Sequence, residues 1–164
     1  MIRLSAFRRF LLHTLVVAML LASPLASALS KSDFDQTVDF SVTLKNIANA
    51  ASGGERLPSK AFIFDATVSE ITVLDPEQAT FKVRVQLISG EWVGLEDVKS
   101  YSCYVTFSGP QYFSLFPAKP PRDATDIVTL NAHLLVAARA GDVTTSPTGE
   151  KLMNLDGFGL RVIP

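Results

Sequence analysis

The residues of this sequence that could perform chemistry are few and widely spaced. Cys103 is the only cysteine among 164 residues, and the two histidines are His13 and His133. Nucleophilic catalysis needs a nucleophile, a base and an orienting acid, and no nucleophile motif accompanies His133. One cysteine and one histidine beyond the N-terminal segment cannot build a structural zinc site. The residue types therefore predict no catalytic residue, no metal site, no cofactor and a chain that is not an enzyme.

The sequence around Cys103 indicates a packing role for this thiol. In "YSCYVTF" (101–107), strand alternation places Tyr101, Cys103, Val105 and Phe107 on one face. A reactive thiol needs a cationic and partly exposed setting, and no cation lies on that face. An unpaired cysteine among apolar side chains behaves as a small hydrophobic residue. We therefore expect Cys103 to be buried in the core.

Five residues are candidates for contacting a ligand or a partner. In "TFKVRVQLI" (80–88), Lys82 and Arg84 alternate with apolar residues and point outward together. Tyr104 belongs to the outward set of the next strand, and Trp92 lies in the connection between the two strands. Tyr112 lies in the aromatic segment "PQYFSLF". Such a set can stack on a sugar or anchor a protein, although Trp92 could instead cap the fold and the basic pair could serve solubility.

The N-terminus has the three parts of a secretory signal peptide. Three arginines precede an apolar run over 11–22, and Ala26-Ser27-Ala28 forms a small-x-small cleavage signal after Pro24. The apolar run is shorter than the roughly 20 residues of a membrane-spanning helix. The sequence thus predicts a signal peptide over 1–28, by the general or the twin-arginine route, and a periplasmic or secreted chain without stable membrane insertion.

Cleavage would change the net charge of the chain. Residues 1–28 contain three of the 15 basic residues and none of the 16 acidic ones, which leaves 12 basic residues and a formal charge of −4. A mildly acidic chain repels phosphate backbones at long range, so we expect no nucleic-acid partner. A protein or glycan partner in the cell envelope is the expectation that remains.

Alternation predicts a mainly β chain with a short connecting segment at each change of direction. We expect strands over 61–74, 80–88, 101–107, 126–142 and 151–164, the last with a bulge at Asp156-Gly157. A turn is expected over 75–78, a loop or distorted pairing over 89–99, and a helical turn over 111–115. Residues 35–50 fit either a strand or a helix, and a helix packed on the barrel is slightly favoured. The domains are then a signal peptide (1–28), a helical or extended segment (29–54) and a β-barrel (55–164).

The order of these elements is that of an OB-fold, a five-stranded Greek-key barrel. On "AFIFDATVSEI", "FKVRVQL", "YSCYVTF" and the late pair "HLLVAARAGD…GLRVI", the chain resembles bacterial exported OB-fold-like proteins over residues 55–163. The predicted fold is a five- to six-stranded antiparallel barrel, with an immunoglobulin-like β-sandwich as the alternative. The resemblance implies binding on the face of the second and third strands. By elimination, an exported, non-catalytic module for a protein or glycan partner is favoured over an accessory envelope subunit or a small hydrolase.

Overall fold

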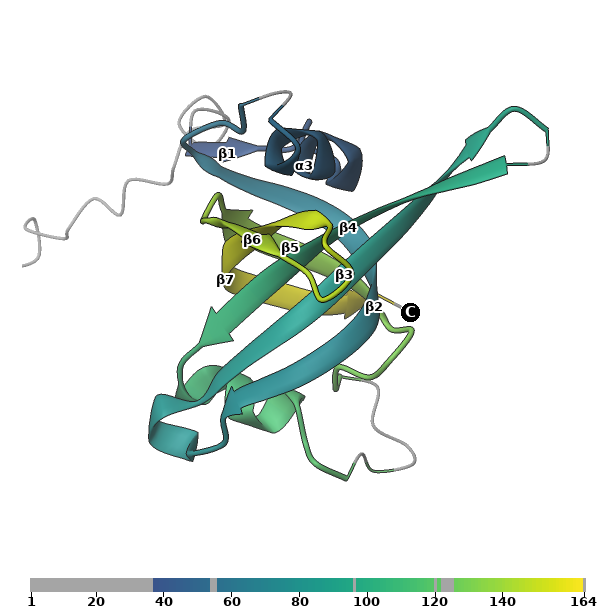
Figure 1. Cartoon of the computed structure of the whole chain (residues 1–164). Helices are drawn as coiled ribbons and strands as arrows, with labels where there is room; N and C mark the ends of the chain where they lie inside the picture. Colours follow the sequence, from purple (N-terminus) through teal and green to yellow (C-terminus); the bar gives the residue numbers. More distant parts are fainter. Residues whose placement is uncertain (1–36, 54–55, 96, 120, 122–125, 164) are drawn as a thin grey trace, which may run out of the picture. The chain divides into compact units, whose positions relative to one another are not determined.

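The computed structural model describes residues 37–53, 56–95, 97–119, 121 and 126–163, which form a β-barrel with short helical segments (Figure 1). The strands are β1 (Val38–Asp39), β2 (Ala61–Asp75), β3 (Lys82–Val93), β4 (Asp97–Ser108), β5 (His133–Arg139), β6 (Val143–Thr145) and β7 (Lys151–Ile163). The helical elements are α3 (Leu44–Ala51) and the 3-10 helices η1 (Gln78–Thr80) and η2 (Pro110–Leu115). Within this part of the chain, no helix has the length and apolar character needed to cross a membrane. The predicted signal peptide lies outside the described residues, so export and location stay predictions.

Five strands close the barrel in the order of an OB-fold. β2 pairs with β3, β3 with β4, β4 with β7, β7 with β5, and β5 again with β2. The chain passes through η2 between β4 and β5, where an OB-fold carries its insertion. The predicted OB-fold is confirmed, and the closed ring of strands replaces the alternative β-sandwich.

The predicted antiparallel pairing needs one correction. The pair β4–β7 is parallel rather than antiparallel, because the last strand enters the ring between β4 and β5 and runs in the direction of β4. The barrel itself closes with five strands, within the predicted five to six, and in the described residues the sheet has two further strands outside the ring. The two additional strands, β1 with 2 residues and β6 with 3, are too short to show alternation in the sequence.

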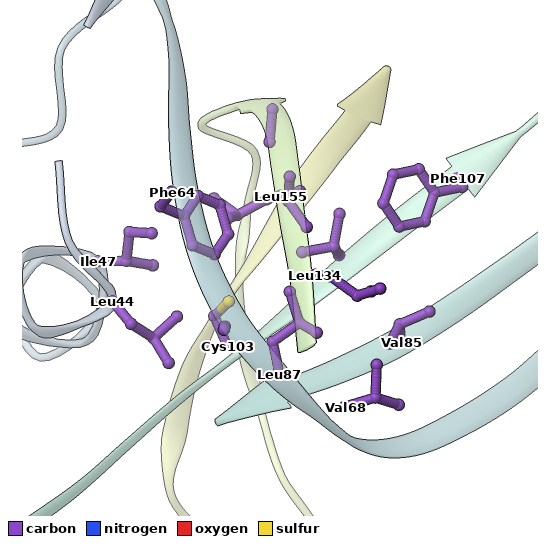
Figure 2. Close-up of a cluster of buried hydrophobic side chains, with 14 of the residues drawn as sticks. Leu44, Ile47, Phe64, Val68, Val85, Leu87, Cys103, Phe107, Leu134 and Leu155 are labelled. Atoms are coloured by element: carbon purple, nitrogen blue, oxygen red, sulfur yellow. The ribbon is translucent and has the colours of Figure 1, made fainter. Parts of the chain in front are cut away.

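The barrel interior is filled by the side chains that alternation assigns to it (Figure 2). On β3, Val83, Val85 and Leu87 are each 0% exposed, as is Cys103 on β4. The predicted burial of Cys103 is confirmed, and this burial raises the pKa of its thiol far above the usual range. Each fully buried Val, Leu or Phe side chain contributes roughly 1.5–3 kcal/mol, so the inward faces of β2, β3 and β4 supply much of the stability.

Helix α3 covers one end of the barrel and inserts Leu44 and Ile47 into its core (Figure 2). The helix begins after Thr43, whose hydroxyl accepts a hydrogen bond from the backbone N–H of Asn46 while the Asn46 side chain accepts one from the Thr43 backbone. The predicted helix over 35–50 is therefore wrong between Val38 and Thr43. Those residues instead include strand β1, which pairs in parallel with β2. The ambiguous pattern encodes a short strand followed by a short helix.

Aromatic side chains from η2 fill the region where β3 begins and β4 ends. The ring of Tyr112 lies 5.1 Å from that of Phe107, and Phe116 lies 6.3 Å from Phe81 between centroids. The predicted helical turn over 111–115 is confirmed as a 3-10 helix. Pro110 begins it, which suits a first helical position that needs no backbone donor.

β5 departs from its predicted start, whereas β7 has the predicted irregularity. β5 begins at His133 and not near 126, because Asn131 adopts a left-handed conformation (φ 65°) and breaks the run. Leu130 lies in the turn before β5 and is 60% exposed. In β7 the predicted bulge is present: Ala137 pairs with Gly159 and Ala138 with Gly157, which leaves Phe158 as the extra residue.

Candidate functional site

The hairpin of β3 and β4 continues beyond the barrel as a two-stranded ribbon (Figure 1). β2 pairs with β3 no farther than Ile88, and β7 pairs with β4 only from Tyr104 to Phe107. β3 and β4 remain paired with each other out to Val93 and Asp97. We call the projecting residues 89–93 and 97–100 the arm.

The arm corrects the prediction of a loop or distorted pairing over 89–99. Its pairing is regular, and the chain turns directly after Val93, where Gly94 has a φ of 76°. The sequence concealed these strands because neither face of the arm is buried by the barrel. A strand alternates between polar and apolar residues when one of its faces is buried. The arm has no buried face, so its residues lack the usual strand pattern.

One face of the ribbon carries the exposed tryptophan. The β3–β4 register runs without a bulge, so Lys82, Arg84 and Trp92 project from the same face of β3. Trp92 is 71% exposed, and its partner Val98 across the ribbon is 50% exposed. The alternative in which Trp92 caps the barrel is therefore wrong, since α3 covers that end. Trp92 and Val98 therefore form an exposed apolar pair on this face of the ribbon.

Arg84 lies on the same face, nearer the barrel. Its guanidinium carbon is 4.7 Å from the centre of the Tyr104 ring. Tyr104 is only 7% exposed because this cation covers its ring. The Nε atom of Arg84 is buried without a hydrogen-bond partner in the described part of the chain. The stack fixes the plane of the guanidinium and leaves its terminal nitrogens to bind an anion.

The basic side chains of this face lack ion-pair partners within the described residues. Neither Lys82 nor Arg84 has a carboxylate oxygen within 4.0 Å there, whereas Lys45, Lys60 and His133 each do. Acidic side chains are present nearby: Asp75 pairs in register with Lys82, and Glu70 accepts a hydrogen bond from Thr72 at 3.0 Å. The face can therefore attract an anion at Arg84, but it is not a strongly basic surface.

The opposite face of the arm is joined to α3. Lys45 Nζ lies 2.8 Å from Glu91 Oε2, and the Tyr101 hydroxyl donates to the same oxygen at 3.0 Å. The hydrogen bond from Lys45, followed by that from Tyr101, lowers the pKa of Glu91. Burial and the bond to Glu91 raise the pKa of Tyr101. These contacts set the direction in which the arm leaves the barrel.

The five predicted binding residues do not form one cluster. Lys82, Arg84 and Trp92 share a face, with Arg84 and Trp92 separated along β3 by about 26 Å at the usual strand rise. Tyr104 lies beneath Arg84 and presents little surface. Tyr112 is 5% exposed and packs on Phe107 near the far end of the barrel, because η2 turns it inward. The sequence did not reveal Val98, whose place opposite Trp92 depends on the register of the arm.

His133 forms a small exposed cluster and no catalytic arrangement with the residues described around it. Its Nε2 lies 3.2 Å from an Asp65 oxygen, and its Nδ1 lies 3.4 Å from the Thr67 hydroxyl. The side chain of Asp65 is 68% exposed, so water competes with this pair. Among the described residues, no group of three His, Cys, Asp or Glu side chains could hold a metal ion.

A groove of about 490 Å³ lies beside β2. Its walls are mostly apolar, and Glu70 is its only charged lining residue. The lining residues are Ser69, Glu70, Ile71, Val73, Phe116, Pro117, Ala118, Val128, Thr129 and Leu130. The sequence did not indicate this groove, because its two sides are separated by more than 40 residues of chain.

Comparison with known proteins gives structural neighbours only. No protein-family model and no curated protein matches the chain. Similar solved structures include a small single-stranded DNA binding protein from Mycoplasma pneumoniae, with 5% identity, a TM-score of 0.38, and coverage of 63% of this chain and 91% of that one. A second is the Plasmodium falciparum SSB complex with ssDNA, at 9% identity, TM-score 0.41, and coverage of 68% and 99%. A third is asparaginyl-tRNA synthetase from Entamoeba histolytica, at 15% identity and TM-score 0.40, which covers 69% of this chain and 22% of the synthetase.

These neighbours contradict the predicted function and partner. The sequence favoured an exported, periplasmic or secreted module for a protein or glycan partner and excluded nucleic acid, whereas two neighbours are named for single-stranded DNA. Those two are named for binding and not for a reaction. The exclusion of nucleic acid rested on the summed charge of the chain. A sum of −4 says little about one face on which Arg84 and Trp92 are both available.

Proposed function

We propose that this chain binds single-stranded nucleic acid on the outer face of β3 and β4. The observation that carries the proposal is the shared face of Trp92 and Arg84. An OB-fold binds oligonucleotides on the face of its second and third barrel strands, which are β3 and β4 here. Single-stranded DNA binding by two of the neighbours is in keeping with the proposal, which rests on the surface itself.

The two residues have complementary roles. Trp92 offers a flat aromatic surface on which an unpaired base stacks, an interaction worth about 1–3 kcal/mol per base. Arg84, oriented by Tyr104, donates to a phosphate oxygen, and Lys82 adds a second positive charge. A duplex keeps its bases stacked on each other and cannot use Trp92 in this way. The site therefore prefers single strands to duplexes.

The small number of cations limits the electrostatic part of the affinity. Each phosphate neutralised in a single strand contributes about −0.7 to the slope of log K against log[salt]. With Lys82 and Arg84 as the contacts, the slope is about −1.4. Stacking then supplies most of the affinity, and binding is moderate and tolerant of salt.

Trp92 makes the proposal testable, because it is the only tryptophan of the chain. Fluorescence of the purified protein is titrated with a thymidine oligonucleotide of about 15 nucleotides, within the site sizes of OB-folds. We expect saturable quenching that a duplex of the same length does not produce. Absence of quenching up to millimolar oligonucleotide contradicts the proposal, and N-acetyltryptophanamide corrects for collisional and absorption effects.

Substitutions test whether the oligonucleotide binds to this face. Arg84→Ala is expected to weaken binding about tenfold, the effect of one charge-assisted phosphate contact. Arg139→Ala is the matched control, because Arg139 stacks on Phe158 at 4.8 Å but on β5. Binding of a labelled oligonucleotide, measured by anisotropy, is lost in Trp92→Ala and retained in Trp92→Phe. Equal losses in the Arg84 and Arg139 variants place the site elsewhere.

A further inference from the structure

The arm has unpaired strand edges as well as exposed faces. On the β7 side, β4 has no strand partner among the described residues from Asp97 to Cys103, since its pairing with β7 starts at Tyr104. The outermost part, residues 97–100, is exposed and carries the apolar Val98 between two charged residues. An open strand edge pairs readily with another strand, and an isolated two-stranded ribbon is only marginally stable in water. Pairing with a further strand would stabilise the arm.

We infer that the free edge of β4 pairs with the same edge of a second copy of this chain. In a two-fold antiparallel pairing, Val98 lies opposite Val98 of the partner subunit. The neighbouring positions then place Asp97 directly opposite Lys99 of the partner subunit, and Lys99 opposite the partner's Asp97. Opposite charges directly across an antiparallel pair are favourable. Two such pairs form per dimer, so the charge pattern of the edge is complementary to itself.

The faces of the resulting four-stranded sheet also match. Trp92 lies across from Val98 in the hairpin, so one face carries a continuous apolar row from Trp92 to the partner's Trp92 through the two valines. On the other face Lys99 lies between Glu91 of its own ribbon and the partner's Asp97. The β3 edge of the arm is the poorer choice, because a two-fold pairing centred on Glu91 would place two like charges opposite each other.

The contact is small, and the dimer is therefore weak. Interfaces of this kind fall in the class of transient contacts, with self-association at about 10–500 µM. Self-pairing does not require nucleic acid, and the inference is independent of the proposed function. The dimer places two Trp92 side chains on the same face of one four-stranded sheet.

Charge reversal gives a test that separates this pairing from other contacts. Asp97→Lys places lysines opposite each other in its homodimer, and Lys99→Glu places acids opposite each other. A mixture of the two variants restores both ion pairs, because the lysine introduced in one chain meets the glutamate introduced in the other, and the unaltered Asp97 and Lys99 meet at the second pair. Sedimentation equilibrium without nucleic acid, up to about 0.5 mM protein, is expected to show a dimer for the unaltered chain. Each single variant should dimerise about tenfold more weakly, and the mixture should regain dimerisation.

Two further measurements keep the test decisive. Circular dichroism and the melting temperature establish that both variants keep the barrel, since positions 97 and 99 are exposed. Hydrogen exchange of the arm amides should slow with rising concentration in the unaltered chain and in the mixture, but not in either variant alone. A chain that remains monomeric at about 0.5 mM overturns the inference. So does a dimer that neither variant weakens, or a mixture no more associated than its components.

Discussion

At the residue scale, one exposed side chain, Trp92, and one buried side chain, Cys103, are the most informative about function. Trp92 lies on a paired strand and not in a loop, so the β3–β4 pairing directs it to one face before any ligand arrives. Preorganisation of this kind lowers the entropic cost of binding. Cys103 is the opposite case, a group with reactive potential that the core removes from chemistry.

The burial of Cys103 predicts a pH dependence of stability. Its pKa is raised in the folded chain, so the folded state keeps the thiol proton while the unfolded state loses it above the ordinary value of 9.0. The thiol's contribution to stability is therefore present below pH 9.0 and is lost as the pH rises. Relative to Cys103→Ala, which cannot ionise, the stability of the unaltered chain should fall by about 1.4 kcal/mol per pH unit above that value. Urea unfolding at several pH values measures this difference, and a pH-independent difference contradicts it.

Side-chain exposure on the outward strand faces was the part that the sequence predicted least well. Alternation placed Lys82, Arg84 and Tyr104 outward, and it was right about direction. It could not show that Arg84 would fold onto Tyr104 and cover it, since that contact is set by the pairing of β3 with β4. Tyr112 was a candidate only for its aromatic neighbours, which turn out to be its packing partners.

The elements were predictable where one of their faces is buried. The inward residues of β2 and β3 follow the expected alternation, because the core imposes a period of two. The arm and the start of β5 were mispredicted for a common reason. The arm residues are not in contact with the core. Asn131 adopts a left-handed backbone conformation that a residue other than glycine seldom adopts. Local pattern alone does not encode either feature.

The bulge in β7 supplies a prediction on the scale of one strand. A Cβ atom on Gly157 would lie 2.7 Å from Val105 Cγ1 and would also meet the ring of Phe107, both fully buried. Gly157→Ala should therefore destabilise the fold by about 1–3 kcal/mol through overpacking. Gly159→Ala in the same strand is the matched control, because its Cβ would meet only the Ala137 Cβ at 3.3 Å. Urea denaturation that shows equal losses for the two variants would contradict this account of the bulge.

On the largest scale that the structure describes, the barrel supports a projecting ribbon (Figure 1). Barrel closure through the β2–β5 pair, the plug of α3 and the aromatic cluster at η2 hold β3 and β4 at their base. The ion pair between Lys45 and Glu91 ties the arm to α3. The surface that carries Trp92 is thus built on paired strands with a fixed register.

The OB-fold could be predicted from the sequence because its order of strands could be recognised from five periodic segments. The proposed partner could not be predicted from the net charge, because net charge averages over the molecule while recognition uses one face. The formal charge of −1 for the full chain includes the three arginines at its N-terminus. Neither that sum nor the value without them describes the β3–β4 face.

The measurement that tests the central claim most directly is amide chemical-shift mapping by NMR. The ¹⁵N-labelled protein is titrated with a thymidine oligonucleotide, and the shifts are followed for the backbone and for the Trp92 indole N–H. We predict that the shifts concentrate at Arg84, Trp92 and Val98, with little change in the groove beside β2. Shifts that centre on Phe116 and Val128 in that groove, or no shifts at millimolar oligonucleotide, would contradict nucleic-acid binding by the β3–β4 face.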